Sequence, residues 1–76
     1  MGHTGAPDYK LRRSLQALLG NGVRVHRAVR DEVSGLNWVT VIVDGKRIHH
    51  QFPPAEQKAV TIEAIQAKVS ALEEAT

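Results

Sequence analysis

The fold is decided by residues 36–52, which read LNWVTVIVDGKRIHHQF. The first half of this stretch, residues 36–43, is rich in β-branched side chains and predicts a strand. The Asp44-Gly45 pair that follows is a strong signal for a two-residue hairpin turn, and residues 46–52 form the returning strand. Pro53-Pro54 ends that strand because proline cannot donate to a strand ladder. The stretch therefore predicts an antiparallel hairpin.

A third strand is predicted before this hairpin, over residues 23–32, where apolar and polar side chains alternate. Val33-Ser34-Gly35 fits a three-residue loop with glycine in the left-handed position. This loop pairs Val29 with Val39, and the Asp44-Gly45 turn pairs Val39 with His50. The two turns together predict one core face, made up of Val25, Val29, Val39, Val41, Val43, Ile48 and Phe52.

Helices are predicted on both sides of the three strands. Leucines recur at i, i+4, i+7 and i+8 from Leu11, which indicates a helix that starts at Pro7-Asp8. Residues 20–22, Gly-Asn-Gly, end it, since these residues accept the left-handed conformation. A second helix is expected over residues 54–74, with Glu56 in its first turn.

This order of helix, strand, strand, strand, helix predicts a two-layer α+β domain, with a three-stranded antiparallel meander and both helices on one face. We expect one domain over residues 8–76 and a flexible tail over residues 1–7. A chain of 76 residues buries only about 60% of its unfolded surface and is marginal as a monomer. This favours a homodimer, formed through the open sheet or through a stripe of small residues on the last helix, namely Val60, Ala64, Ala67 and Ala71.

The charge of the chain is unevenly distributed. The net charge is only +2, but residues 9–30 hold six Lys or Arg and no acid. A polyanion would therefore meet the amino-terminal half. Residues 1–7 lack the parts of a signal peptide, and the apolar run over residues 38–43 is far too short to span a bilayer, so we expect a cytoplasmic protein.

Neither a metal site nor an enzyme is predicted. The sequence has no cysteine, so it has no disulfide and no zinc-thiolate site. His49 and His50 are adjacent on a strand, point to opposite faces and cannot chelate one ion. No serine lies at a readable spacing from a base, and no glycine-rich phosphate loop is present. We therefore expect no cofactor and no catalytic residue.

The sheet face opposite the core is predicted to stay open to solvent and to carry the function. Arginine, histidine and tryptophan share this face, and no carboxylate lies in its middle, which suits nucleic acid. A protein contact through the same face, as in a phage-type inhibitor or a small assembly factor, is the alternative. The candidate nucleic-acid-binding residues are Arg24, His26, Arg30, Trp38, Thr40, Arg47 and His49 on the sheet, with Arg12 and Arg13 on the outer side of the first helix.

The run from Trp38 to Arg47, with Phe52, Glu56 and Ala59 after it, resembles three-stranded-sheet DNA-binding domains. These are the arm-binding regions of phage integrases and the plant ethylene-response-factor type. The resemblance, over roughly residues 22–65, implies that the sheet enters the major groove of DNA. It also implies contacts from the matching strand residues, Arg24, Trp38 and Arg47.

The predicted element order is also that of double-stranded-RNA-binding domains. That family uses its first hairpin loop and a lysine cluster at the start of the last helix. Here the loop over residues 31–35 is acidic, and the last helix opens Glu56-Gln57-Lys58. The resemblance therefore extends to the element order, and these charges argue against the RNA-binding function of that family.

Overall fold

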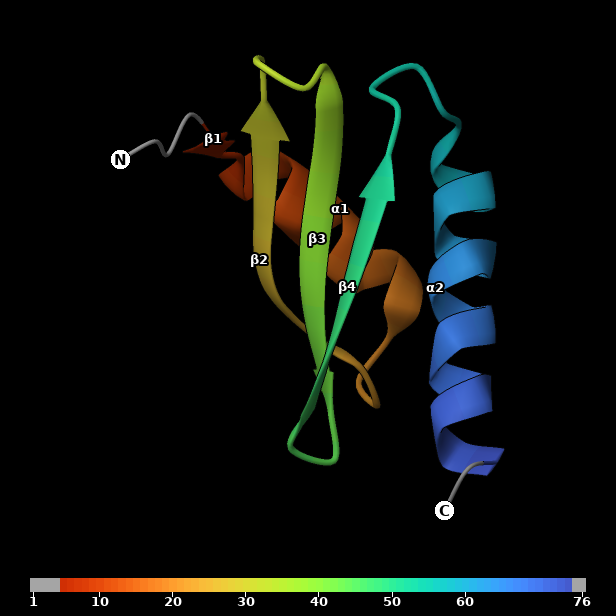
Figure 1. Ribbon diagram of the computed structural model, residues 1–76. Coiled ribbons are helices and arrows are strands. Elements are labelled where there is room, and N and C mark those ends of the chain that lie inside the picture. Colours follow the sequence, from red (N-terminus) through yellow and green to blue (C-terminus); the bar gives the residue numbers. More distant parts are fainter. Residues whose placement is uncertain (1–4, 75–76) are drawn as a thin grey trace.

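The computed structural model describes residues 5–74, which form two helices and one antiparallel sheet (Figure 1). The strands lie in the order β1-β2-β3-β4, and the predicted α+β class is confirmed. No helix in residues 5–74 is long and apolar enough to cross a membrane. The elements are β1 (Gly5–Pro7), α1 (Tyr9–Leu19), β2 (Arg24–Asp31), β3 (Leu36–Val43), β4 (Lys46–Phe52) and α2 (Lys58–Glu74).

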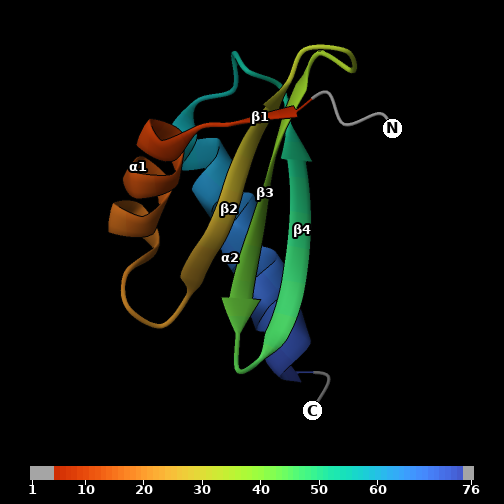
Figure 2. The same cartoon turned by 90° about the vertical axis from the view of Figure 1, so that its left-hand side faces the viewer.

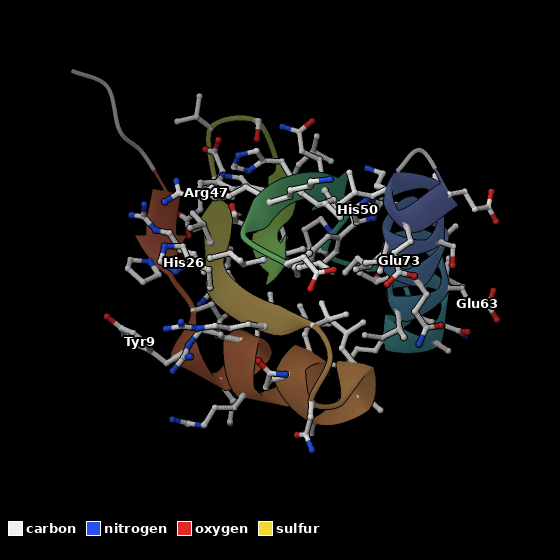
Figure 3. The ribbon with its side chains drawn as sticks, turned by 90° about the horizontal axis from the view of Figure 1, so that it is seen from below. Tyr9, His26, Arg47, His50, Glu63 and Glu73 are labelled. Carbon is white, nitrogen blue, oxygen red and sulfur yellow. The ribbon has the colours of Figure 1, made fainter. Side chains whose placement is uncertain are left out.

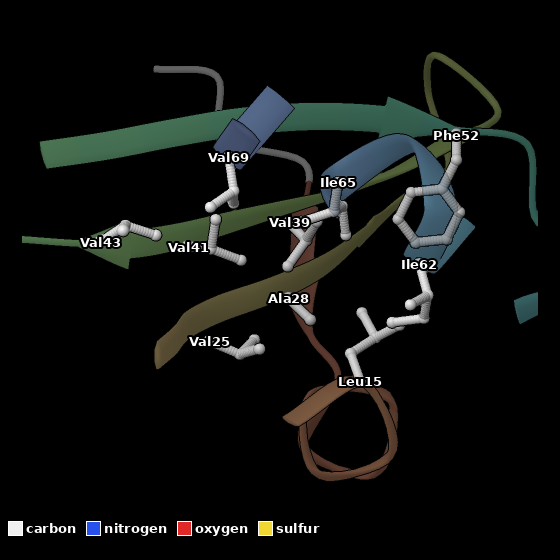
Figure 4. Packing of buried hydrophobic residues seen from close by; sticks show 10 residues of the cluster. All are labelled: Leu15, Val25, Ala28, Val39, Val41, Val43, Phe52, Ile62, Ile65 and Val69. Atoms are coloured by element: carbon white, nitrogen blue, oxygen red, sulfur yellow. The ribbon is translucent and has the colours of Figure 1, made fainter. Parts of the chain in front are cut away.

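Both helices cover the same side of the sheet. Figure 2 shows the sheet nearly edge-on with α1 on one side of it, and Figure 3, seen from below, shows the core enclosed by the sheet, α1 and α2. The other side of the sheet has no helix over it. The core seen in Figure 4 is made up of Leu15, Val25, Ala28, Val39, Val41, Val43, Phe52, Ile62, Ile65 and Val69.

Helix α1 begins and ends as predicted. Asp8 is its N-cap, and the Oδ1 of Asp8 accepts a hydrogen bond of 3.0 Å from the backbone N–H of Leu11. Gly20, at φ 82°, ends the helix, and its N–H donates to the Gln16 carbonyl at 3.1 Å. Leu15 is fully buried. The leucine spacing therefore predicted the helix and its buried residue correctly, but Leu18, the third leucine of the pattern, is 54% exposed.

Two of the predicted boundaries are wrong. Residues 5–7, predicted as part of a flexible tail, form strand β1. This strand pairs with the end of β2 from Gly5↔Asp31 to Pro7↔Val29. Residues 1–4 of the predicted tail lie outside the described residues. Helix α2 begins at Lys58 and not at residue 54, because residues 53–56 first form a turn closed by a 3.0 Å hydrogen bond from the N–H of Glu56 to the Pro53 carbonyl.

The register of β3 and β4 is confirmed from Val43↔Lys46 to Asn37↔Phe52. The register of β2 and β3 is not. The loop between them has four residues and not three, so Asp31, and not Glu32, pairs with Leu36. The side chain of Asp31 explains the longer loop: its Oδ1 accepts from the N–H groups of residues 33 and 34, at 3.1 and 3.4 Å.

A bulge in β2 adds a second one-residue shift. Val25 pairs with Val41, whereas Arg27 pairs with Thr40, so His26 is the extra residue. Between the loop and the bulge every β2 side chain is therefore on the opposite face from the predicted one. Ala28 takes the core position predicted for Val29, and Val29 is buried on the other face of the sheet.

Candidate nucleic-acid interface

We call the sheet side without helices the open face. Figure 3 shows two of its residues, His26 and Arg47, on the side of the sheet away from both helices. Strand alternation and the bulge fix the membership of this face. It consists of Arg24, His26, Arg27, Val29, Trp38, Thr40, Ile42, Arg47, His49 and Gln51, with Asp31 and Leu36 at its end.

A cluster of polar and aromatic side chains occupies the centre of the open face. The guanidinium carbon of Arg27 lies 5.9 Å from the centre of the Trp38 ring, within the range of a cation–π contact. The ring of His49 meets Trp38 edge-on, with 6.3 Å between ring centres. Trp38 is thus half-buried between Val29 and Gln51 on the neighbouring strands, and the guanidinium of Arg27 lies over its ring.

Two predicted site residues do not fit a contact role. Thr40 is only 3% exposed, and its hydroxyl is joined by a 2.8 Å hydrogen bond to Nδ1 of His49. Thr40 therefore orients His49 and does not reach a ligand. Arg30 faces the helix side because of the longer loop, and it lies 3.7 Å from the carboxylate of Asp8 in an ion pair.

Arg24 and Arg47 lie on the predicted face, although Arg24 takes the place beside Ile42 that the predicted register gives to His26. Both are exposed, and both flank Ile42 in the register, Arg24 from β2 and Arg47 from β4. Across two strand spacings, their backbones are roughly 10 Å apart. The two arginines can therefore contact one ligand together, from the two strands that flank β3.

Arg27 is a candidate site residue that the sequence did not predict. The three-residue loop assigned it to the core face, although an unpaired arginine is rarely buried. The signal that would have placed it correctly is Asp31 followed by Ser34-Gly35. An aspartate that caps a turn, with glycine at its end, favours the longer loop.

The edge strand β4 borders a hollow of about 590 Å³, lined by Trp38, His49, His50, Gln51 and Lys68. The ammonium of Lys68 donates to the backbone carbonyl of His49 at 3.3 Å and to Nδ1 of His50 at 3.0 Å. Lys68 of α2 therefore lies against the edge of the sheet.

His50 is held in its neutral form by this environment. Nδ1 accepts from Lys68, so the proton is on Nε2, which is buried and has no hydrogen-bond partner among the described residues. Burial, together with the neighbouring Lys68 charge, lowers the pKa of His50 below its usual 6.5, against a smaller opposing effect of Glu56. His50 also stacks on Phe52, with ring centres 5.9 Å apart. It acts as a structural side chain.

The two arginines of α1 that were predicted as site residues differ in their position. Arg12 is half-buried and lines a hollow beside β2, together with His26 and Arg27. Arg13, which the sequence predicted as a site residue, is exposed on α1 and does not line this hollow, so the candidate site does not include it. Within residues 5–74 no group of three or more His, Asp or Glu side chains is arranged to hold a metal ion.

Comparison with known proteins gives no relative for this arrangement. The sequence matches no protein-family model, and neither a curated protein nor a solved structure matches the chain significantly.

Proposed function

We propose that this protein binds duplex DNA through the open face of its sheet. The observation that carries the proposal is that three arginines share one sheet face: Arg24 and Arg47 flank Ile42, and Arg27 lies with His49 against Trp38. Guanidinium groups form charge-assisted hydrogen bonds with phosphates and with guanine edges. The face therefore carries the donors that a DNA duplex requires.

The position of the carboxylates supports this orientation. Glu63 and Glu73 lie on α2, on the far side of the core from His26 and Arg47 (Figure 3). Asp31 stands at the end of the open face, where its side chain already accepts two backbone hydrogen bonds of the turn. A polyanion approaching the middle of the face would meet arginine and no opposing acid.

Duplex DNA fits the face better than a single strand or an RNA helix does. Proteins that bind single strands present a row of aromatic side chains for the bases to stack on. Here Trp38 is the one Trp, Tyr or Phe on the described open face, and Arg27 lies over its ring. The major groove of RNA helices is too narrow for side chains to read, whereas that of B-DNA is about 12 Å wide and admits β-strands.

The test compares two double variants that remove the same charge. Arg24→Gln with Arg47→Gln changes the open face, and Lys10→Gln with Lys58→Gln changes exposed residues on the helix side. Affinity for a mixed-sequence duplex is measured against salt concentration. Each lost phosphate contact should make the logarithmic salt slope shallower by about one, so the arginine variant should lose about two.

Circular dichroism must show both double variants folded. Equal binding by the two would contradict the proposal, as would a wild-type protein that binds no duplex at low salt. Docking of a protein on the open face would then become the leading hypothesis. The chemistry of that face favours DNA, because Trp38 and Ile42 are half-buried and leave no broad apolar patch for a protein partner.

A further inference from the structure

The bulge in β2 creates a second cationic feature next to the open face. Because His26 is an extra residue opposite β3, the consecutive side chains of His26 and Arg27 are both exposed on the same side of the strand. A regular strand would send one of them into the core. The bulge thus brings two adjacent nitrogen-bearing side chains to the outer edge of the sheet.

The start of α1 lies against this same edge. The N–H of Asp8 donates to the Ala28 carbonyl at 2.9 Å, which fixes the chain as it turns from β1 into the helix. Tyr9, which is 62% exposed, and Arg12 are thereby brought beside the bulge. Figure 3 shows Tyr9 and His26 on the same side of the molecule.

Between these segments lies what we call the edge hollow, lined by residues 7–9, Arg12 and residues 26–28, with a volume of about 380 Å³. Its one carboxylate, Asp8, is already engaged, by the N–H of Leu11 at 3.0 Å and by Arg30 at 3.7 Å. Within the described chain neither Arg12 nor Arg27 forms an ion pair with an acid. The hollow therefore has a net positive lining.

We infer that the edge hollow binds a backbone phosphate of the DNA duplex whose groove the open face enters. Arg12 and Arg27 supply the charge, and His26 supplies a further ring nitrogen. The inference rests on the proposed function and adds a defined phosphate site to it. Arg27 belongs to both the open face and the edge hollow, so a DNA strand that leaves the open face at Arg27 reaches Arg12 next.

Arg12 and Arg13 provide a matched test, because they are adjacent on one helix and only Arg12 lines the hollow. With a short mixed-sequence duplex, Arg12→Gln should make the salt slope shallower by about one, and Arg13→Gln should leave it unchanged. Arg12→Lys keeps the charge and should keep the slope. Melting curves show whether each variant folds. If Arg12→Gln does not fold, the hollow is tested in the wild-type protein by NMR, where addition of the duplex should shift the Tyr9 and His26 amide resonances.

The results separate this inference from the proposed function. Equal salt slopes for Arg12→Gln and Arg13→Gln overturn the inference that the edge hollow binds a phosphate. Tyr9 and His26 amide resonances that do not shift on addition of the duplex overturn it as well. If the Arg24 and Arg47 variant still weakens binding, the open face stands. If Arg12→Gln weakens binding while that double variant does not, the hollow is supported and the open face is wrong. A wild-type protein that binds no duplex at low salt overturns both.

Discussion

The side chain of Gln16 holds the junction between α1 and β2 together. Its Nε2 donates to the carbonyls of Gly20 and Val23, at 2.8 and 2.9 Å, and its Oε1 accepts from the N–H of Val25 at 2.8 Å. The amide thus makes hydrogen bonds with three backbone groups between the end of α1 and the start of β2. Gln16→Met keeps the length of the side chain and removes all three hydrogen bonds, so it isolates their contribution to stability.

The expected loss can be estimated from these bonds. The bonds to Val23 and Val25 are partly buried and count for about 1 kcal/mol each, while the exposed bond to Gly20 counts for less. The free energy of unfolding should therefore fall by about 2–3 kcal/mol. A domain of this size shifts its Tm by about 4–8 °C per kcal/mol, so the melting temperature should fall by roughly 8–24 °C.

Thermal and urea unfolding, followed by circular dichroism, measure this loss. Gln66→Met is the matched control, since Gln66 is exposed on α2, and its unfolding free energy should stay within about 0.5 kcal/mol of the wild type. If Gln16→Met melts together with the control, the junction does not depend on these hydrogen bonds and the reasoning is refuted.

Two further predictions concern the core and the pH dependence of stability. Ala28→Asp buries an unpaired carboxylate and should abolish the folded circular dichroism signal. Arg30→Ala removes only an exposed ion pair, so it should lower the free energy of unfolding by less than about 1 kcal/mol. An Ala28→Asp variant that folds would contradict the register of β2. Because the His50 pKa is lowered in the folded state, the unfolded chain binds more protons below pH 6.5, so the urea midpoint should fall as the pH drops from 7.5 to 5.5. His50→Gln should flatten this dependence, and an unchanged slope would show that His50 is not its source.

The parts of the fold that could be predicted are those in which a short stretch of sequence permits only one local structure. Asp44-Gly45 permits a two-residue turn, and Asp44 and Gly45 indeed have φ values of 51° and 77°. That turn fixes every pair of β3 and β4, which places Trp38, Arg47 and His49 on the open face. Leucine spacing likewise predicted the burial of Leu15, although Leu18 of the same pattern is 54% exposed.

The parts that could not be predicted depend on contacts between distant residues. Strand β1 has three residues and no apolar pattern, and it exists because it pairs with the end of β2. The bulge at His26 lies within a run whose alternation suggests a regular strand. Neither feature has a signal within its own segment, since both depend on how β2 meets its neighbours.

The core proved less sensitive to these errors than the candidate site did, for a geometric reason. The longer loop and the bulge each shift β2 by one residue, and two such shifts restore the original face at Val25. Between them, residues 28 and 29 are both small and apolar, so either one can fill the core. The neighbouring arginines are not equivalent: the same shifts move Arg27 onto the open face and Arg30 toward Asp8. The cationic surface thus depends on the exact loop length, whereas the core depends only on the apolar pattern.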